Sequence, residues 1–303
     1  MPRFRACAVL ALFAGCGRIA FAELDSGDAT AAATCWPAWK AGTIAFQPPG
    51  PITELASPVG RSNPSLSADG LTLYFVEETA GNNDVWFAKR VDLGSPWQDA
   101  QSLGGPGTSI NTGVDERRFA TAGNGTIGIV TSRRSGSLAL WYATRPTPTG
   151  PFGTASQTLV ASLDLANHDQ FDPELINDGL VLYFAPTSGS IQQIARATRP
   201  AIDTAFAPAT MLTELEISSV IGDPTISPDD LVIVFASVVG ANNDLFYATR
   251  AVRTDPFGTP VSLSSLNTTV ADEGDGELSP DGCELLYFSD PTGTDQLFAA
   301  KVN

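Results

Sequence analysis

The chain has 303 residues, 43% of them hydrophobic, which is enough for one large β domain or two smaller ones with a substantial core. Its 33 acidic and 17 basic residues give a formal charge of −16, which disfavours nucleic acid and anionic membrane surfaces as partners. The single histidine, His168, excludes multi-histidine zinc sites and leaves one candidate base for a Ser-His-Asp mechanism.

The N-terminus has the pattern of a secretory signal. Arg3 and Arg5 precede an apolar run, residues 6–15, that is too short to span a bilayer permanently. We therefore expect this segment to direct export and to take no part in the folded domain.

Two cleavage sites remain open. The F-A-G-C sequence at 13–16 resembles a bacterial lipobox, in which residues 1–15 are removed and Cys16 is lipidated. The A-F-A sequence at 20–22 is typical of ordinary secretion with cleavage after Ala22. Both predict a protein secreted across the inner membrane of a bacterium, as a periplasmic protein or an outer-membrane lipoprotein. The only membrane contact expected is the lipid on Cys16.

The four cysteines are informative once export is assumed. Cys7 leaves with the signal, and Cys16 is removed or lipidated, so Cys35 and Cys283 remain. An oxidising compartment favours a disulfide between them. The alternative is two unrelated buried thiols.

Residues 16–42 are expected to form a linker whose end becomes ordered around Cys35, Trp36 and Trp39. From 43 to 303 the chain repeats. Each copy has a short segment ending in a turn, a β-rich run, a Gly/Asn/Asp turn and a second run that usually ends in a basic residue. The copies lie at 63–90, 118–145, 172–199, 223–250 and 276–301, with steps of 55, 54, 51 and 52 residues between equivalent turn positions.

A period in the low fifties with three strand-like runs per copy is typical of propeller blades. A fourth run begins at an aromatic residue in the first four copies, at 97–103, 152–160, 206–215 and 257–263. We therefore predict an all-β fold, a five-bladed β-propeller with four antiparallel strands per blade.

The fifth copy, 276–301, lacks a fourth run. Residues 43–56 match the segment before the fourth copy, with Phe46 over Phe206 and Leu55 over Leu215. We therefore predict that 43–56 supply the missing strand of the last blade and close the ring, which removes exposed sheet edges.

The pattern D-P-x-x-S-P-D-G-x-x-L/I-x-F, followed by G-x-x-D-L/I-F/Y, resembles the WD40-like Pro-Asp repeats of TolB-type β-propellers. The resemblance covers about 43–303 and is weakest in the second copy. It implies that the loops entering the innermost strand share one face with the loops between the second and third strands. The S-P-D-G turns then lie on the opposite face.

Acidic residues concentrate in the loops that enter the innermost strand. Because that strand lines the axis, we expect them to surround one mouth of the channel and to attract cations. They either form a ligand or partner site or cap their own loops. A Ca²⁺ site within 272–277 is a further alternative, and no other cofactor is predicted. The candidate residues are Asp115, Glu116, Asp169, Asp172, Asp223, Asp272, Glu273 and Asp275.

Four arginines belong to the degenerate second copy: Arg117, Arg118, Arg133 and Arg134. They either pair with carboxylates at the surface, neutralise the acidic residues around the channel mouth, or bind an anion.

No G-x-S-x-G, Walker or CxxC pattern is present. We therefore favour a monomeric, non-catalytic cell-envelope propeller that binds a protein or glycan partner through the acidic loop face. The alternative is a glycoside hydrolase, which needs only a pair of axial carboxylates. The regularity of the repeats favours the first hypothesis, since catalytic propellers tend to diverge between blades.

Overall fold

The computed structural model describes residues 34–303, except 80, 105–109 and 165–167. The predicted signal peptide, both cleavage sites and Cys16 lie outside the described residues. Within the described part of the chain, no helix is long and apolar enough to cross a membrane.

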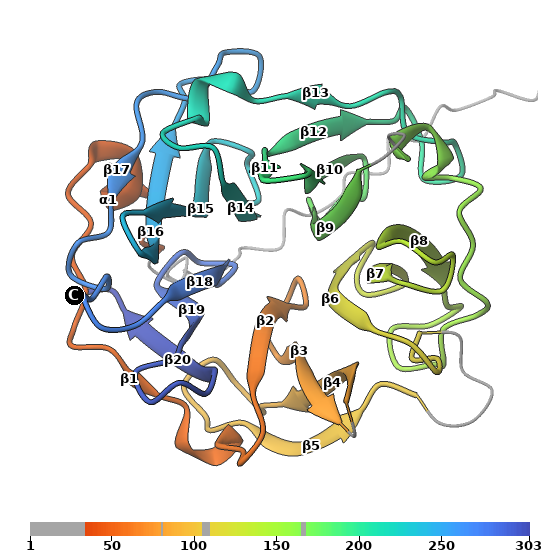
Figure 1. The fold of residues 1–303 in the computed structure, drawn as a ribbon, viewed down its shortest axis with the longest axis horizontal. Coiled ribbons are helices and arrows are strands. Elements are labelled where there is room, and N and C mark those ends of the chain that lie inside the picture. The colour runs from red at the N-terminus through yellow and green to blue at the C-terminus, as the bar shows by residue number, and fades with distance from the viewer. Residues whose placement is uncertain (1–33, 80, 105–109, 165–167) are drawn as a thin grey trace, which may run out of the picture. The chain divides into compact units, whose positions relative to one another are not determined.

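Five antiparallel sheets surround a central axis, so the predicted five-bladed β-propeller is confirmed (Figure 1). Blade 1 comprises β2 (Arg61–Leu66), β3 (Thr72–Thr79), β4 (Asn82–Lys89) and β5 (Gln98–Ser102). Blade 2 comprises β6 (Glu116–Ala122), β7 (Ile127–Ser132) and β8 (Ala139–Thr144). Blade 3 comprises β9 (Asp169–Leu175), β10 (Val181–Ser188), β12 (Ala195–Thr198) and β13 (Thr210–Met211), with a short β11 (Ile191–Gln192) beside β10. Blade 4 comprises β14 (Ile221–Ile226), β15 (Val232–Val239), β16 (Asn242–Thr249) and β17 (Val261–Ser262). Blade 5 comprises β18 (Glu273–Leu278), β19 (Glu284–Ser289), β20 (Gln296–Lys301) and β1 (Gly50–Pro51).

The outermost strands are shorter than the runs predicted for them. In blade 2 the fourth strand is reduced to a bridge between Tyr142 and Ser156. In blade 3 the strand ends after two residues, and the chain turns into a 3-10 helix, η3 (Thr213–Leu215). Two similar helices, η1 (Thr53–Leu55) and η2 (Ala161–Leu163), lie in blade 5 and after the blade 2 bridge. An edge strand forms ladder bonds on one side only, so short pairing is sufficient there.

The ring closes as the sequence predicts. β1 pairs with β20, with Gly50 opposite Ala299, and Phe46 forms a bridge to Val302. Figure 1 shows the red N-terminal strand beside the blue C-terminal one. The predicted Cys35–Cys283 disulfide is also present, with 5.0 Å between the Cα atoms.

The basic residue that ends each of the first four repeats binds the first hairpin turn of its own blade. Arg90, Arg145, Arg199 and Arg250 each donate from Nε to a carbonyl of the first hairpin turn, those of Gly70, Gly125, Gly179 and Asp230. Each guanidinium also lies 4.2–4.5 Å over the aromatic ring that starts the fourth run. This explains why these repeats end in arginine, since the planar cation can both donate and stack.

Blade 5 ends in Lys301, and Trp39 takes the place of the arginine. Trp39 lies on α1 (Trp36–Ala41), a helix formed by the end of the predicted linker. Its Nε1 donates to Gly282 O at 2.8 Å, and its ring packs edge-on against Phe46 and Tyr247. The ordered unit therefore begins before residue 43, because this helix fills the position that the other blades fill from within.

Candidate functional site

The innermost strand of every blade contains a bulge, and one residue from each bulge faces the axis. In chain order these are Asn63, Arg118, Asp172, Asp223 and Asp275, judged by the strand registers. The asparagine and the three aspartates have positive φ angles of 51–55°, a conformation that these residue types tolerate better than most. We call these five residues the axial ring.

The three aspartates of the axial ring converge. One carboxylate oxygen from each lies within 4.8 Å of the other two. Asp275 N donates to Asp223 Oδ2 at 3.1 Å, and Asn63 donates to Asp275 Oδ2 from both its backbone and side-chain nitrogens, at 2.9 and 3.0 Å. The carboxylates therefore join neighbouring blades around the axis.

Arg118 departs from the other members of the ring. Its side chain is fully buried and donates from Nη2 to Glu277 Oε2 at 2.7 Å and to Glu174 Oε2 at 3.2 Å. These glutamates lie two residues beyond Asp275 and Asp172 on their strands. Blade 2 thus supplies a cation that spans from its own strand to blades 3 and 5.

Burial is the main influence on the axial carboxyls. It raises the pKa of Asp172 and Asp275, and Asp223 raises both further. Burial raises the pKa of Glu174 to about 7, although Arg118 opposes the shift. It also raises the pKa of Glu277, with Glu174 adding to the effect. The axis therefore holds protons at pH values where exposed carboxyls are ionised.

Burial alone would lower the pKa of Arg118, but Glu277 and Glu174 raise it above its ordinary value. Its Nε and Nη1 have no hydrogen-bond partner among the described residues. The guanidinium is thus held by charge more than by a complete set of hydrogen bonds.

Among the residues that the structure describes, the aspartate trio is the one acidic group close enough together to hold a cation. The trio offers three oxygens, whereas Ca²⁺ takes six to eight. Within the predicted 272–277 segment, Glu273 accepts bonds from Thr268 and Ser289, and Glu277 binds Arg118. Only Asp275 of that segment joins the trio.

Three other predicted residues link successive blades. Each accepts a hydrogen bond from a backbone amide near the start of the preceding blade's third strand. The pairs are Asn83 to Asp115 at 3.2 Å, Leu138 to Asp169 at 3.0 Å and Asn243 to Asp272 at 2.7 Å. This contact places the loops entering the innermost strand beside those between the second and third strands.

Glu116 and Glu273 occupy equivalent, fully buried positions. Glu116 accepts from Thr112 N and Ser132 Oγ, both at 2.7 Å, and Glu273 accepts from Thr268 N at 2.8 Å and Ser289 Oγ at 3.1 Å. Of the eight predicted site residues, the structure thus brings together Asp172, Asp223 and Asp275, while the other five lie around them in loop and strand contacts.

Two of the remaining arginines of blade 2 pair with carboxylates. Arg133 lies 3.5 Å from Asp115, and Arg134 lies 3.4 Å from Glu116. Arg117 lies 5.7 Å from the ring centroid of Phe171. Arg118 is therefore the arginine of this group that neutralises carboxylates at the axis, because it pairs with Glu174 and Glu277.

Five carboxylates from blades 1, 4 and 5 lie near one another on the face formed by the loops that enter the innermost strands. Burial raises the pKa of Asp244, and Asp272 raises it further. Burial also raises the pKa of Asp295, with contributions from Asp290, Asp272 and Glu78. None of the five forms an ion pair within the described ranges. We call Glu78, Asp244, Asp272, Asp290 and Asp295 the acidic face.

The sequence analysis named only Asp272 from the acidic face as a site residue. The signal for Asp244 and Asp295 was present, since Asp244 lies near the start of a third strand and Asp295 directly precedes one. Their proximity to Asp290 and Glu78 depends on how neighbouring blades meet, which no local pattern records.

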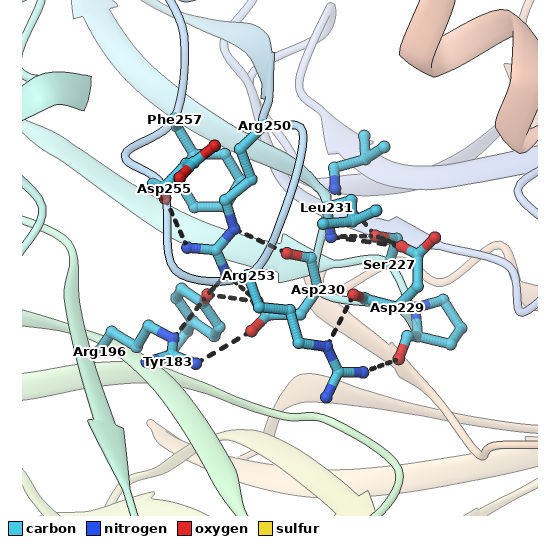
Figure 2. Close-up of polar contacts among 12 residues, drawn as sticks. Tyr183, Arg196, Ser227, Asp229, Asp230, Leu231, Arg250, Arg253, Asp255 and Phe257 are labelled. Carbon is cyan, nitrogen blue, oxygen red and sulfur yellow. Dashed lines mark hydrogen bonds and ion pairs between the residues drawn. The ribbon is translucent and has the colours of Figure 1, made fainter.

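A second buried charge cluster lies between blades 3 and 4 (Figure 2). Asp230 stands where the other first turns have glycine, with a φ of 62°. Its carboxylate contacts Arg196 at 3.0 Å and Arg250 at 2.5 Å, and it accepts a bond from Tyr183 Oη. Asp230 is fully buried, so this cluster stabilises the blade boundary.

No family model matches the chain, and no curated protein matches it. Among solved structures, an endo-arabinase from Bacteroides thetaiotaomicron is 15% identical, with a TM-score of 0.58 over 86% of this chain and 97% of that one. The catalytic domain of a GH62 α-L-arabinofuranosidase from Coprinopsis cinerea is 11% identical, with a TM-score of 0.58 over 86% and 96%. TolB from Acinetobacter baumannii is 15% identical with a TM-score of 0.48, and this match covers 82% of this chain but only 56% of TolB. At these identities the two matches with a TM-score of 0.58 show a shared fold.

Proposed function

We propose that this chain is a non-catalytic cell-envelope propeller that binds a protein or glycan partner through the acidic face. The supporting observation is that five carboxylates from three blades lie together without an ion-paired cation among the described residues. A cationic partner would relieve their mutual repulsion. A basic protein segment therefore suits this surface better than a neutral glycan does.

The disulfide supports an extracytoplasmic location, since such bonds persist in oxidising compartments. The lipobox-like sequence at 13–16 supports a lipid anchor at Cys16. The resemblance of the repeats to WD40-like Pro-Asp repeats agrees with an envelope propeller.

A glycoside hydrolase is the second candidate, because the fold is shared with an endo-arabinase and an α-L-arabinofuranosidase and three aspartates meet at the axis. One feature of the axis favours binding instead. Asp172 and Asp275 are only 5% exposed, Asp275 is hydrogen-bonded to Asn63 and Asp223, and Asp172 is hydrogen-bonded to Asp223, so little of either carboxyl group is open to a substrate.

The binding proposal can be tested with a fluorescently labelled octalysine peptide and the triple variant Asp244→Asn, Asp290→Asn, Asp295→Asn. We expect this variant to bind the peptide about tenfold more weakly than the unmodified chain in anisotropy titrations at low salt. The matched control is Asp92→Asn, Asp203→Asn, Asp255→Asn, which removes the same charge from exposed loops elsewhere.

Equal weakening by the two triple variants would mean that net charge alone attracts the peptide, and would contradict the proposal. Hydrolysis of linear arabinan or a nitrophenyl arabinofuranoside that is lost in Asp223→Asn would establish the hydrolase instead.

A further inference from the structure

A cavity of about 550 Å³ lies between blades 1 and 2 and is separate from the axial ring. It is bordered by the first turns of both blades, by the start of β3 and the end of β4, and by the loop before Phe152. Three aromatic rings, those of Tyr74, Phe87 and Phe152, form part of its wall. Both the volume and this lining are typical of small-molecule pockets.

The strand register explains why this boundary is open. Thr72 of blade 1 and Ile127 of blade 2 are equivalent, because each is paired with the residue just before the terminal arginine. At the next boundary Ile127 Cδ1 lies 3.0 Å from a Cβ built on Gly179. At the equivalent Gly125, the three atoms nearest to such a Cβ belong to Arg145 and Pro148, and none belongs to Thr72. The shorter Thr72 leaves unfilled the space that Ile127 fills one blade further on.

Two of the three charged side chains that line the cavity, Lys89 and Arg145, are basic, although the chain has a formal charge of −16. Arg145 donates to the carbonyls of Gly125 and Gly150 and to Tyr74 Oη, but it forms no ion pair with a carboxylate of the described residues. By contrast, the equivalent Arg90 and Arg250 pair with Glu284 and Asp230. Asp69, the carboxylate at the cavity edge, is engaged by Ser67 Oγ and Leu71 N.

Lys89 provides a second cation at the cavity. Its side chain is exposed, and its Nζ lies 5.7 Å from the ring centroid of Phe87. The cavity therefore combines aromatic walls with two basic groups at its edge. A neutral apolar ligand would use only the walls, and an inorganic anion would use only the charges.

We propose that this cavity binds a small amphiphilic anion, with an aromatic body between Tyr74, Phe87 and Phe152 and a carboxylate facing Lys89 and Arg145. The ring faces supply apolar contact, and the two cations supply charge-assisted hydrogen bonds. This site lies at a blade boundary, and its occupancy does not depend on the acidic face.

The test uses 2-naphthoate as the probe and 2-naphthamide as its neutral analogue, both titrated calorimetrically into the chain. We expect one 2-naphthoate to bind per chain, about tenfold more tightly than the amide. Thr72→Ile should abolish binding of both compounds, because the added atoms occupy the cavity as Ile127 does at the next boundary.

Lys89→Ala keeps the test valid if Thr72→Ile fails to fold. It should weaken 2-naphthoate binding several-fold and leave naphthamide binding unchanged. Lys301→Ala is the matched control, because Lys301 has the same register position in blade 5 and should leave both affinities unaltered. No saturable binding, equal affinity for the two compounds, or equal effects of the two lysine variants would each overturn the proposal.

Discussion

Two buried triads in this propeller have opposite composition. At the axis, one cation, Arg118, lies between Glu174 and Glu277. At the boundary of blades 3 and 4, one carboxylate, Asp230, lies between Arg196 and Arg250. A carboxyl group can lose its charge by taking up a proton, whereas a guanidinium in a protein cannot lose its own. The axial triad can therefore adapt to pH, and the boundary triad must stay paired.

Both triads arise where one copy departs from the repeat. Arg118 replaces the Asn or Asp of the axial ring, and Asp230 replaces the glycine of the first turn. Each departure is balanced by groups from neighbouring blades, which shows that the blades depend on each other's side chains.

The largest effect is expected at the boundary triad. Asp230→Ala should lower the free energy of unfolding by about 3–5 kcal/mol, because it leaves two arginines without their carboxylate. Urea denaturation would measure the loss. Asp230→Gly removes the same carboxylate but suits the left-handed φ, so it should recover about 1 kcal/mol. Wild-type stability in Asp230→Gly would show that the ion pairs contribute nothing.

A smaller, pH-dependent effect is expected at the axis. Arg118→Met should cost about 2–4 kcal/mol at pH 8, where Glu174 and its neighbours are left as uncompensated buried charges. The cost should shrink at pH 5, since Glu174, with a pKa of about 7, is then protonated. Chemical denaturation would measure the loss of stability at both pH values. An equal loss at pH 5 and pH 8 would contradict the inference that protonation of Glu174 relieves the buried charge.

The smallest effect concerns the unmodified axis. Glu174 has a pKa of about 7 in the folded protein and 4.5 as its ordinary value, so the folded state holds a proton that the unfolded chain has released. Its stabilising contribution is complete below about pH 4.5, falls as pH rises and is lost above about 7. Glu174→Gln should therefore flatten the decline in stability between pH 5 and 8 by about 1–2 kcal/mol. Thermal melts across this range would measure it, and an unchanged slope would assign the decline to other groups.

The blade number, the ring closure and the disulfide could be predicted because they follow from repetition along the chain. Each copy carries its own strands and turns, and the missing strand of the fifth copy has one match, at 43–56. The Cys35–Cys283 pairing then follows, because ring closure brings the segment before residue 43 to the blade that carries Cys283.

The side-chain contacts at the axis could be predicted only in part from the sequence. Asp172, Asp223 and Asp275 were found as acids close to the innermost strand, although the sequence assigned them to the entering loops and the structure places them within β9, β14 and β18. Arg118 was grouped with the three other arginines of its repeat. Its role depends on a bulge that turns it inward and on glutamates from two other blades. The open space at Thr72 likewise depends on the residue facing it across a boundary, which lies outside the pattern of a single repeat.

The disulfide also has a mechanical consequence. β1 pairs with β20 at two positions, with a few further backbone hydrogen bonds beside them, so tension applied from its N-terminal side would load a short seam. A pulling force on the segment before Cys35 reaches Cys283 through the S–S bond before it reaches β1. The load therefore enters the first hairpin of blade 5 directly, and the short seam between β1 and β20 is shielded from tension applied before Cys35.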